Sequence, residues 1–355
     1  MLFDLPDHPT LYRALLDRDA RFDGRAFVGV ATTGVFCRLT CPARKPRPEN
    51  CSFFGTVAEC LAAGFRPCRR CRPAGPSATD DPSVSTLLAA LDACPERRWS
   101  EADLVRMGFD PSTVRRSFRR HFGITFLDLA RQRRLRGGFQ SLARGDRVID
   151  AQLDAGFDSP SAFREAFARL LGRPPGELAR PGLLFADWIA TPLGDMIAVS
   201  SARHLHLLEF VGRKALPAEL AQVEREAKGR LGLGSAPPTE QLRGELSAYF
   251  AGSCATFRTP VAPGGSGFAQ QVWDELRRIP AGETRSYSDI ARAIGRPSAV
   301  RAVARANGAN RIALVIPCHR VIGADGALTG YGGGLWRKQR LIEIERRYRR
   351  QEASA

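Results

Sequence analysis

The residues of this chain that could do chemistry are mainly its cysteines. Six of nine cysteines in the 355-residue chain lie between positions 37 and 71. Four of them form two close pairs, Cys37 with Cys41 and Cys68 with Cys71. Two close pairs of soft sulfur ligands suit a tetrahedral zinc ion. We therefore expect one Zn²⁺ held by these four thiolates, and the alternative is a set of buried or paired thiols.

Cations surround both pairs. They are Arg38, Arg44, Lys45 and Arg47 near the first pair, and Arg66, Arg69, Arg70 and Arg72 near the second. Four thiolates on Zn²⁺ carry a formal charge of −2, so these cations either offset that charge or hold phosphates. A purely structural zinc module has the same spacing. Cys60 lies on the apolar face of a helical pattern over residues 57–64, and we expect it in the core.

A second reactive cysteine lies near the C-terminus. Residues 316–321 place Cys318 beside His319 and Arg320. An adjacent base can make a thiol nucleophilic near neutral pH. The pair alone is a weak signal, because sequence neighbours need not face each other and buried cysteines are common. We expect both Cys37 and Cys318 to be held as anions.

Composition indicates the class of partner. The chain has 53 Lys and Arg against 37 Asp and Glu, a formal net charge of +16, which favours a polyanion such as nucleic acid. No run approaches the roughly 18 apolar residues of a spanning helix, and the N-terminus lacks a signal pattern. We therefore expect a cytoplasmic protein. An odd number of cysteines without an export signal argues against a disulfide framework.

Breaks in the pattern divide the chain into three blocks. Residues 72–83 read as a linker, and residues 173–182 contain three prolines. Between the breaks, a run that begins at residue 108 recurs at residue 156, a spacing typical of a repeated two- or three-helix unit. Each unit predicts a helix-turn-helix, with helices at residues 100–107, 111–122, 148–155 and 159–171. These residues alone leave a plain helical bundle as the alternative.

The last block begins with strands and continues with helices. Residues 197–199 and 205–210 are strand-like, and helical patterns return from residue 270. His204 and His206 alternate with leucines, which is more typical of a partly exposed strand than of a metal site. Cys94 and Cys254 lie in no motif.

Residues 32–44 and 63–71 resemble the N-terminal domain of Ada-type bifunctional DNA methyl-transfer proteins. The resemblance implies that Cys37 accepts a methyl group from a methylphosphotriester in DNA, with Cys41, Cys68 and Cys71 as the other zinc ligands. It also suggests that Thr33, Arg44 and Arg66 contact the DNA backbone. A thioether at Cys37 would reduce the formal charge of the site to −1 and tighten DNA binding.

The repeated block resembles the DNA-binding domain of AraC-type regulators, most clearly over residues 156–175. The resemblance implies that the later helix of each unit enters the major groove. Arg115, Arg116, Arg119 and Arg120 make the first of these helices basic. Two features depart from expectation: Gly137 and Gly138 fall inside a predicted helix, and Glu165 puts an acid on a DNA-facing one.

Residues 301–345 look like the O6-alkylguanine-DNA alkyltransferases. The resemblance implies that Cys318 accepts alkyl groups from O6-alkylguanine and also from O4-alkylthymine. The roles implied for other residues are these: His319 is a base acting through water, Glu345 orients His319, Asn310 supports the active-site turn, Tyr287 and Arg301 rotate the nucleotide out of the duplex, and Tyr331 walls the base pocket. Base extrusion costs a few kcal/mol, which an inserted Arg offsets.

Together these features predict a multidomain α+β protein. We expect a zinc-bound α/β domain at 1–75, an all-α double helix-turn-helix domain at 84–178, and an alkyltransferase. The alkyltransferase would have an α/β subdomain at 183–265 and a winged-helix-like catalytic subdomain at 266–355.

The expected function is irreversible repair of alkylated double-stranded DNA, with transcriptional activation at promoter DNA after methylation of Cys37. RNA polymerase is an open partner, and we expect a monomer. One alternative is a zinc-containing regulator that recognises alkylated bases without transfer. Another is a repair protein that has lost regulation.

Overall fold

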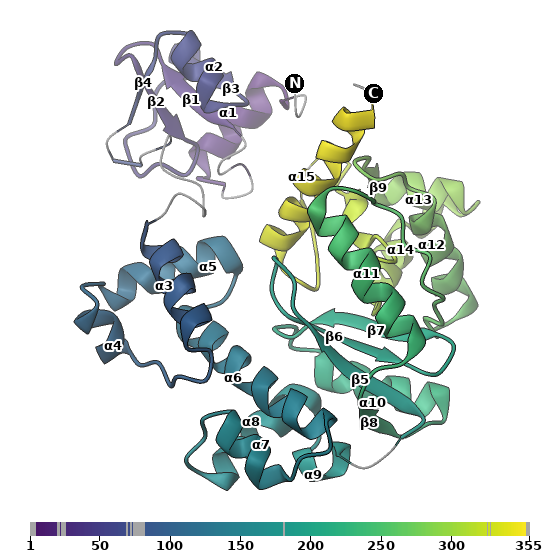
Figure 1. Ribbon diagram of the computed structural model, residues 1–355. Helices are drawn as coiled ribbons and strands as arrows, with labels where there is room; N and C mark the ends of the chain where they lie inside the picture. Colours follow the sequence, from purple (N-terminus) through teal and green to yellow (C-terminus); the bar gives the residue numbers. More distant parts are fainter. Residues whose placement is uncertain are drawn as a thin grey trace. The chain divides into compact units, whose positions relative to one another are not determined.

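The computed structural model describes residues 5–19, 22, 26–68, 70–71, 73, 82–179, 182–324, 326 and 328–352 (Figure 1). The chain forms two compact units, residues 1–81 with 325–327, and residues 82–324 with 328–355. Most of the predicted linker lies outside the described residues. Within these residues, no helix is both long and apolar enough to cross a membrane.

The first unit is built on a four-stranded sheet in the order β3-β1-β2-β4. The central strands pair antiparallel, and only β4 runs parallel to its neighbour β2. Cys60 is fully buried among aromatic side chains, as predicted. The elements are α1 (His8–Leu16), β1 (Phe27–Val30), β2 (Val35–Arg38), the 3₁₀ helix η2 (Pro48–Asn50), β3 (Cys51–Phe54), α2 (Val57–Ala62) and β4 (Arg66–Pro67).

Strand pairing in this unit brings the two cysteine pairs together. β1 and β2 are joined by a tight turn in which Gly34 has φ +62°, a conformation that glycine adopts without strain. Cys37 follows that turn on β2, and the Cys68 amide donates to the Phe36 carbonyl at 3.0 Å. The parallel β2–β4 pairing therefore delivers the second cysteine pair beside the first.

The second unit begins with the repeated helices. All four helices predicted from the repeat are present, with ends within one residue of those expected. Ser100, Asp110 and Ser159 cap three of them by accepting a hydrogen bond from a first-turn amide. The elements are α3 (Pro82–Ala93), α4 (Glu101–Arg106), α5 (Pro111–Phe122), α6 (Phe126–Ala143), α7 (Val148–Asp154), α8 (Pro160–Leu171) and α9 (Pro175–Leu178).

The rest of the second unit combines a sheet with a helical subdomain. The sheet has the order β7-β6-β5-β8, of which the sequence indicated only β6 and β7. Its elements are β5 (Leu184–Ile189), β6 (Met196–Ser200), β7 (Leu205–Phe210), α10 (Leu216–Ala227), β8 (Leu231–Leu233) and α11 (Pro237–Ala251). The helical subdomain contains α12 (Gly267–Arg277), β9 (Arg285–Ser286), α13 (Tyr287–Ala293), η4 (Pro297–Ala299), α14 (Val300–Gly308), η5 (Cys318–Arg320), β10 (Val321–Ile322) and α15 (Leu335–Glu352).

The two faces of this sheet pack against different helices. One face contributes Met196 and Leu208 to a core shared with α11, α12 and α14. The other contributes Trp188 and Val199 to a core shared with α6, α8 and α10. The proline-containing segment 173–182 therefore does not separate two hydrophobic cores. The domain boundaries expected at residues 178 and 183 remain a prediction.

The paired glycines of α6 have different surroundings. The helix is continuous through Gly137 and Gly138. A Cβ on Gly138 would lie 2.8 Å from the Ala151 carbonyl and 2.9 Å from Phe163, whereas one on Gly137 would meet nothing closer than 3.5 Å. Gly138 thus permits α6 to pack closely on α7 and α8, which explains one departure noted in the sequence.

We expect Gly138→Ala to destabilise the second unit by about 1–3 kcal/mol, because the added methyl group overpacks a closed contact. The matched variant Gly137→Ala should be neutral or stabilising by up to about 1 kcal/mol, because alanine favours the helix. Thermal unfolding followed by circular dichroism measures both. Equal melting temperatures for the two variants would contradict the packing role of Gly138.

Candidate functional site

The four predicted zinc ligands converge at one point. The sulfur atoms of Cys37, Cys41, Cys68 and Cys71 all lie within 4.8 Å of one another. Tetrahedral Zn²⁺ with Zn–S bonds of about 2.3 Å needs sulfur atoms roughly 3.8 Å apart. Cys37 and Cys41 are buried, and the other two are partly exposed. The donor set and its spacing therefore fit one zinc ion.

The electrostatics of the cluster also require a cation. Hydrogen bonding to Cys71, together with burial, raises the pKa of the Cys37 thiol far above its usual value. The same interaction lowers the pKa of Cys71 to about 5. Four sulfur atoms this close cannot all be anions without a cation between them, so without metal they share protons. A bound Zn²⁺ replaces those protons. The Arg38 amide also donates to the Cys71 sulfur at 3.4 Å.

A cavity of about 1000 Å³ opens beside this cluster. Its lining includes Cys37 and all three residues expected to contact DNA: Thr33, Arg44 and Arg66. Lys45 also lines it, with its ammonium group fixed by the carbonyls of Leu39 and Cys41 at 3.3 Å. A sulfur nucleophile and several cations thus face one space. Arg69 and Arg72 lie outside the described residues.

Helix α5 presents a basic face to solvent. Arg115, Arg116 and Arg119 are all exposed on it, and Arg115 forms an ion pair with Glu101 of α4. On α8, Glu165 is exposed and pairs with Arg169 one turn later. The pair neutralises the acid locally, so Glu165 is an ordinary i,i+4 surface contact.

Cys318 lies in a buried turn held by Asn310. The side-chain amide of Asn310 donates to the Cys318 sulfur at 3.1 Å and to the Ile316 carbonyl at 2.9 Å. Its oxygen accepts from the Ile312 amide at 3.0 Å. The segment before the turn is fixed to strand β7, because Ala313 donates to the Leu208 carbonyl at 2.8 Å. Asn310 both shapes the turn and hydrogen-bonds the sulfur.

His319 is fully buried and oriented by Glu345 of α15. Its Nε2 lies 2.8 Å from the Glu345 carboxylate. The same carboxylate accepts two hydrogen bonds from Arg320, at 2.8 and 2.9 Å, and one from the Tyr249 hydroxyl at 3.0 Å. His319 Nδ1 has no hydrogen-bonding partner among the described residues. One ring nitrogen is thus fixed, and the other is free for proton transfer.

The protonation states differ from the sequence-based expectation for Cys318. Burial raises the pKa of the Cys318 thiol to about 11, although the hydrogen bond from Asn310 opposes this. Burial also lowers the pKa of His319, so the imidazole is neutral at pH 7. The expectation that Cys318 is held as an anion is therefore wrong for the free protein. If Cys318 is the acceptor that the sequence predicts, its thiol must ionise as it reacts, and the neutral His319 imidazole could take the proton.

A second cavity, of about 640 Å³, contains Cys318. Tyr287, Asn310 and Tyr331 line it, and the Tyr331 hydroxyl is buried without a partner among the described residues. Of these three, Tyr331 is the one that the sequence predicts in a base pocket, and that role stays a prediction. Arg301 lies elsewhere, exposed near the start of α14. This position is outside the cavity lining, on a helix whose Ala304, Asn307 and Gly308 do line it.

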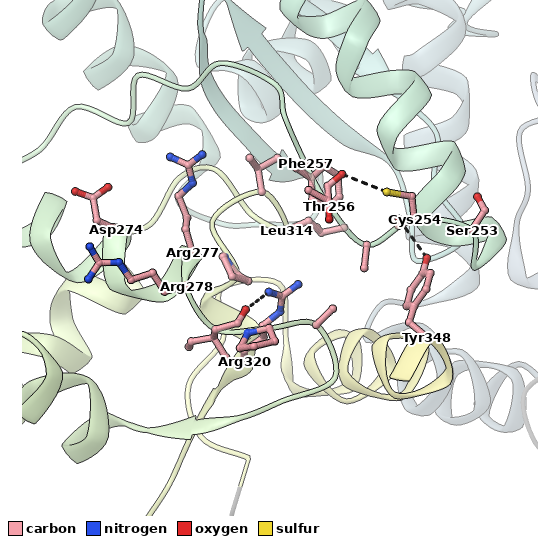
Figure 2. A pocket seen from close by; sticks show the side chains of 16 residues that line it. Ser253, Cys254, Thr256, Phe257, Asp274, Arg277, Arg278, Leu314, Arg320 and Tyr348 are labelled. Carbon is pink, nitrogen blue, oxygen red and sulfur yellow. Dashed lines mark hydrogen bonds between the residues drawn. The ribbon is translucent and has the colours of Figure 1, made fainter. Parts of the chain in front are cut away.

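Figure 2 shows a different cavity, of about 790 Å³, next to the same turn. Pro317 and Arg320 line it, but Cys318 does not. The Arg320 guanidinium donates to the Ile279 carbonyl, and the Tyr348 hydroxyl donates to the Cys254 carbonyl at 3.5 Å. This cavity therefore borders the residue that supports Glu345 and is separate from the one containing the thiol.

Several residues of the Cys318 site were missed by sequence reasoning. Tyr249 and Lys338 are buried and lie far from the cysteine in sequence. The Lys338 ammonium donates to the Thr329 carbonyl at 2.6 Å. Arg320 was noted only as a neighbour of His319. A long-range contact leaves no local pattern, so only the adjacency of Arg320 was a usable signal.

Three family models match the chain. They are the metal binding domain of Ada at residues 10–74, a helix-turn-helix domain at 105–181, and the DNA binding domain of 6-O-methylguanine DNA methyltransferase at 267–347. Their order is the order of domains expected from the sequence.

Two relatives match this chain over nearly its whole length and over nearly their own. The bifunctional transcriptional activator/DNA repair enzyme Ada of Escherichia coli is 36% identical over 347 residues, 94% of this chain and 95% of that protein. The chain belongs to the Ada family. The regulatory protein ada of Salmonella typhimurium is 34% identical, covering 92% of this chain and 94% of that protein.

The C-terminal part has its own relatives. The methylated-DNA–protein-cysteine methyltransferase of Mycolicibacterium paratuberculosis is 59% identical over 104 residues, 29% of this chain and 63% of that protein. Membership of the Ada family confirms the resemblance found in the sequence, the multidomain fold class and the zinc-binding cluster. The roles of individual residues stay predictions.

We expect Cys318 in the free protein to react slowly with iodoacetamide at pH 7, because its raised pKa of about 11 leaves it protonated. Its rate should increase about tenfold per pH unit up to that pKa. Mass spectrometry of the Cys318 peptide measures this, with the exposed Cys254 as an internal reference. A rate that is already maximal at pH 7 would show that the thiol is ionised.

Proposed function

We propose that this protein repairs alkylated DNA in the cytoplasm by moving alkyl groups onto two of its own cysteines. The observation that carries the proposal is the presence, on one chain, of two cysteines that each line a cavity together with cationic side chains. Membership of the Ada family supports it. Among the described residues that line the two cavities, none is suited to cleave a thioether, so each cysteine is proposed to react once.

Cys37 is the proposed acceptor for methylphosphotriesters. Its sulfur forms a bond to the methyl carbon, while the carbon–oxygen bond breaks and leaves an ordinary phosphodiester. When bound, zinc keeps the sulfur deprotonated and nucleophilic at neutral pH. Arg44 and Arg66 hold the flanking phosphates at the rim of the cavity, and Thr33 contacts the backbone beside them. These residues position the methyl carbon in front of the sulfur.

Methylation of Cys37 is the proposed switch. It converts an anionic sulfur to a neutral thioether, so one negative charge disappears from a site that faces DNA phosphates. In a low-dielectric interface, the removal of one such repulsion changes binding by a few kcal/mol. Repair at Cys37 thereby increases the affinity of the first unit for DNA.

Cys318 is the proposed acceptor for O6-alkylguanine and O4-alkylthymine. Its sulfur bonds to the alkyl carbon, the bond from that carbon to the base oxygen breaks, and the departing base anion takes up one proton from solvent to give the restored base. The thiol proton moves through solvent to His319 Nδ1, which is buried and without a partner among the described residues. Glu345 stabilises the resulting imidazolium. Asn310 donates to the sulfur as its charge develops.

The substrate base must leave the DNA stack to reach Cys318. Tyr287 lines the cavity at the start of α13, and Tyr331 forms its far wall. Arg301 is exposed on α14 and is proposed to fill the vacated position in the duplex. Arg301 lies outside the cavity, which agrees with this assignment, because the side chain that replaces the flipped base must enter the DNA duplex and not the pocket.

Transcriptional activation is the proposed role of the helices α4 to α8. Helix α5 follows a turn and exposes Arg115, Arg116 and Arg119, as a major-groove helix requires. Helix α8 is the equivalent of α5 in the second repeat. RNA polymerase is the proposed partner at the promoter, and a single copy of each domain favours a monomer.

We expect the protein to gain two methyl groups, on Cys37 and Cys318, when it is incubated with duplex DNA that carries both lesions. Cys37→Ala should lose only the phosphotriester methyl group, and Cys318→Ala only the O6-methylguanine one. A zinc chelator should prevent methylation of Cys37 and spare that of Cys318. Intact-mass and peptide mass spectrometry locate each methyl group. Wild-type protein that gains no methyl group would refute transfer at both sites.

We expect Arg116→Ala and Arg119→Ala each to weaken promoter binding by the Cys37-methylated protein and to reduce the salt dependence of binding. One lost phosphate contact should lower the slope of log K against log salt by about one unit. Arg144→Ala, outside both DNA-facing helices, is the control. Fluorescence anisotropy from 50 to 200 mM salt gives the slopes, and slopes equal to that of the control would exclude α5 from the interface.

A further inference from the structure

A charged cluster from the sheet subdomain reaches the cavity that contains Cys318. Arg213 follows strand β7, and its Nε and Nη2 lie 2.9 and 2.7 Å from Oε1 of Glu219 on α10. Its Nη1 lies 3.4 Å from Glu209, the residue that precedes the last residue of β7. The side chains of Arg213 and Glu209 are only 11% and 4% exposed. The guanidinium is thus held in one position.

Arg213 also contacts the two segments that form the cavity walls. Its Nη2 donates to the carbonyl of Gly308, at the end of α14, at 3.2 Å. Its Nη1 lies directly against Gly332, because a Cβ at that position would be 1.3 Å from this nitrogen. Both Gly308 and Gly332 line the cavity with Cys318. One side chain therefore connects the sheet subdomain to both walls.

The charges around Cys318 come from several elements. The groups that face it are Glu209 of β7, Arg213 after β7, Lys338 of α15, Tyr331 before α15 and the amide of Asn310. His319 is its neighbour in η5, and Tyr287 of α13 lines the same cavity. Among the described residues, Lys338 and Arg213 bring positive charge close enough to the sulfur to lower the pKa of the Cys318 thiol.

An ionised Glu209 would counteract the effect of Arg213 and Lys338 on the Cys318 sulfur. Burial raises the pKa of Glu209 to about 8, although the nearby guanidinium of Arg213 works against this. Below that pH Glu209 is mostly protonated, so it adds little negative charge beside the thiol. Glu219, which also pairs with Arg213, does not line the cavity. Of the Arg213–Glu219 ion pair, the guanidinium is therefore the charged group that lines the cavity.

We propose that Arg213 is a positioning residue of the Cys318 site, whose guanidinium stabilises the sulfur anion during transfer and holds Gly308 and Gly332 in place as cavity walls. The inference rests on the proposed acceptor role of Cys318 and adds the sheet subdomain to the reacting site. Arg213 acts through Cys318 and the walls, and it is not itself an acceptor or a base.

The test measures the pH profile of Cys318 alkylation by iodoacetamide in the full chain. Arg213→Met removes the charge and keeps an unbranched side chain. We expect its alkylation to be about tenfold slower than that of wild type at every pH below the thiol pKa, the effect of a shift of one pH unit. Arg213→Lys should stay within about threefold of wild type. Arg243→Met breaks a comparable ion pair with Asp187, away from the cavity, and should match wild type.

Two further variants keep the test decisive if Arg213→Met fails to fold. Gly332→Ala displaces the guanidinium and should slow alkylation as Arg213→Met does. Glu209→Gln removes the opposing charge and should speed alkylation several-fold above pH 8, where wild-type Glu209 is ionised. Profiles of the folded variants that superimpose on wild type would overturn the proposal.

Transfer from duplex DNA with O6-methylguanine gives a second readout. Single-turnover rates should fall about tenfold in Arg213→Met and recover in Arg213→Lys. The acceptor role of Cys318 and the positioning role of Arg213 can fail separately. Wild-type protein that accepts no methyl group from this DNA refutes the acceptor role. The iodoacetamide profile uses no DNA and tests Arg213 directly. An effect on transfer without any change in the alkylation profile would also overturn the electrostatic role.

Discussion

Both proposed acceptor sites depend on one constraint: a buried sulfur must carry negative charge when it attacks an alkyl carbon of DNA, and burial opposes that charge. In the first unit, four sulfurs within 4.8 Å of one another require a shared cation, and the anion is stabilised by metal binding. In the second, Cys318 is a single buried thiol whose pKa is raised to about 11. In the proposed reaction, the charge develops there while Asn310 and nearby cations stabilise the sulfur and His319 takes the proton.

The Cys318 site needs a rigid support for the His319 ring, and Glu345 supplies it. Its carboxylate accepts hydrogen bonds from the His319 ring, twice from Arg320, from the Tyr249 hydroxyl and from the Gly282 amide. Although burial opposes ionisation, the neighbouring His319 and Arg320 hold the pKa of Glu345 well below its usual range. The loss of one partner from such a buried pair costs about 3–5 kcal/mol. The imidazole is therefore fixed by the same network that joins α15 to the turn.

The sequence predicted the parts of the sites that are local in the chain. The spacing of four cysteines, the helices of the repeat and the Cys318–His319 neighbourhood are short-range patterns, and the structure has all of them. The contributions of Tyr249, Lys338 and Arg213 could not be predicted, because each reaches Cys318 or Glu345 from a distant element. The pKa of Cys318 could not be predicted either, since it depends on burial, which no local motif determines.

The division of the chain into separate hydrophobic cores bears on how Cys37 and the helix-turn-helix helices would act together in the proposed function. Helices α6 to α9 share a core with the sheet subdomain, whereas the zinc-binding cluster lies in a separate compact unit. In the proposed switch, methylation of Cys37 removes one negative charge beside DNA. When one chain carries two DNA-binding units, tighter binding by the first raises the local concentration of the second at the same DNA. Under the proposed function, the DNA itself would therefore carry the signal from Cys37 to α5.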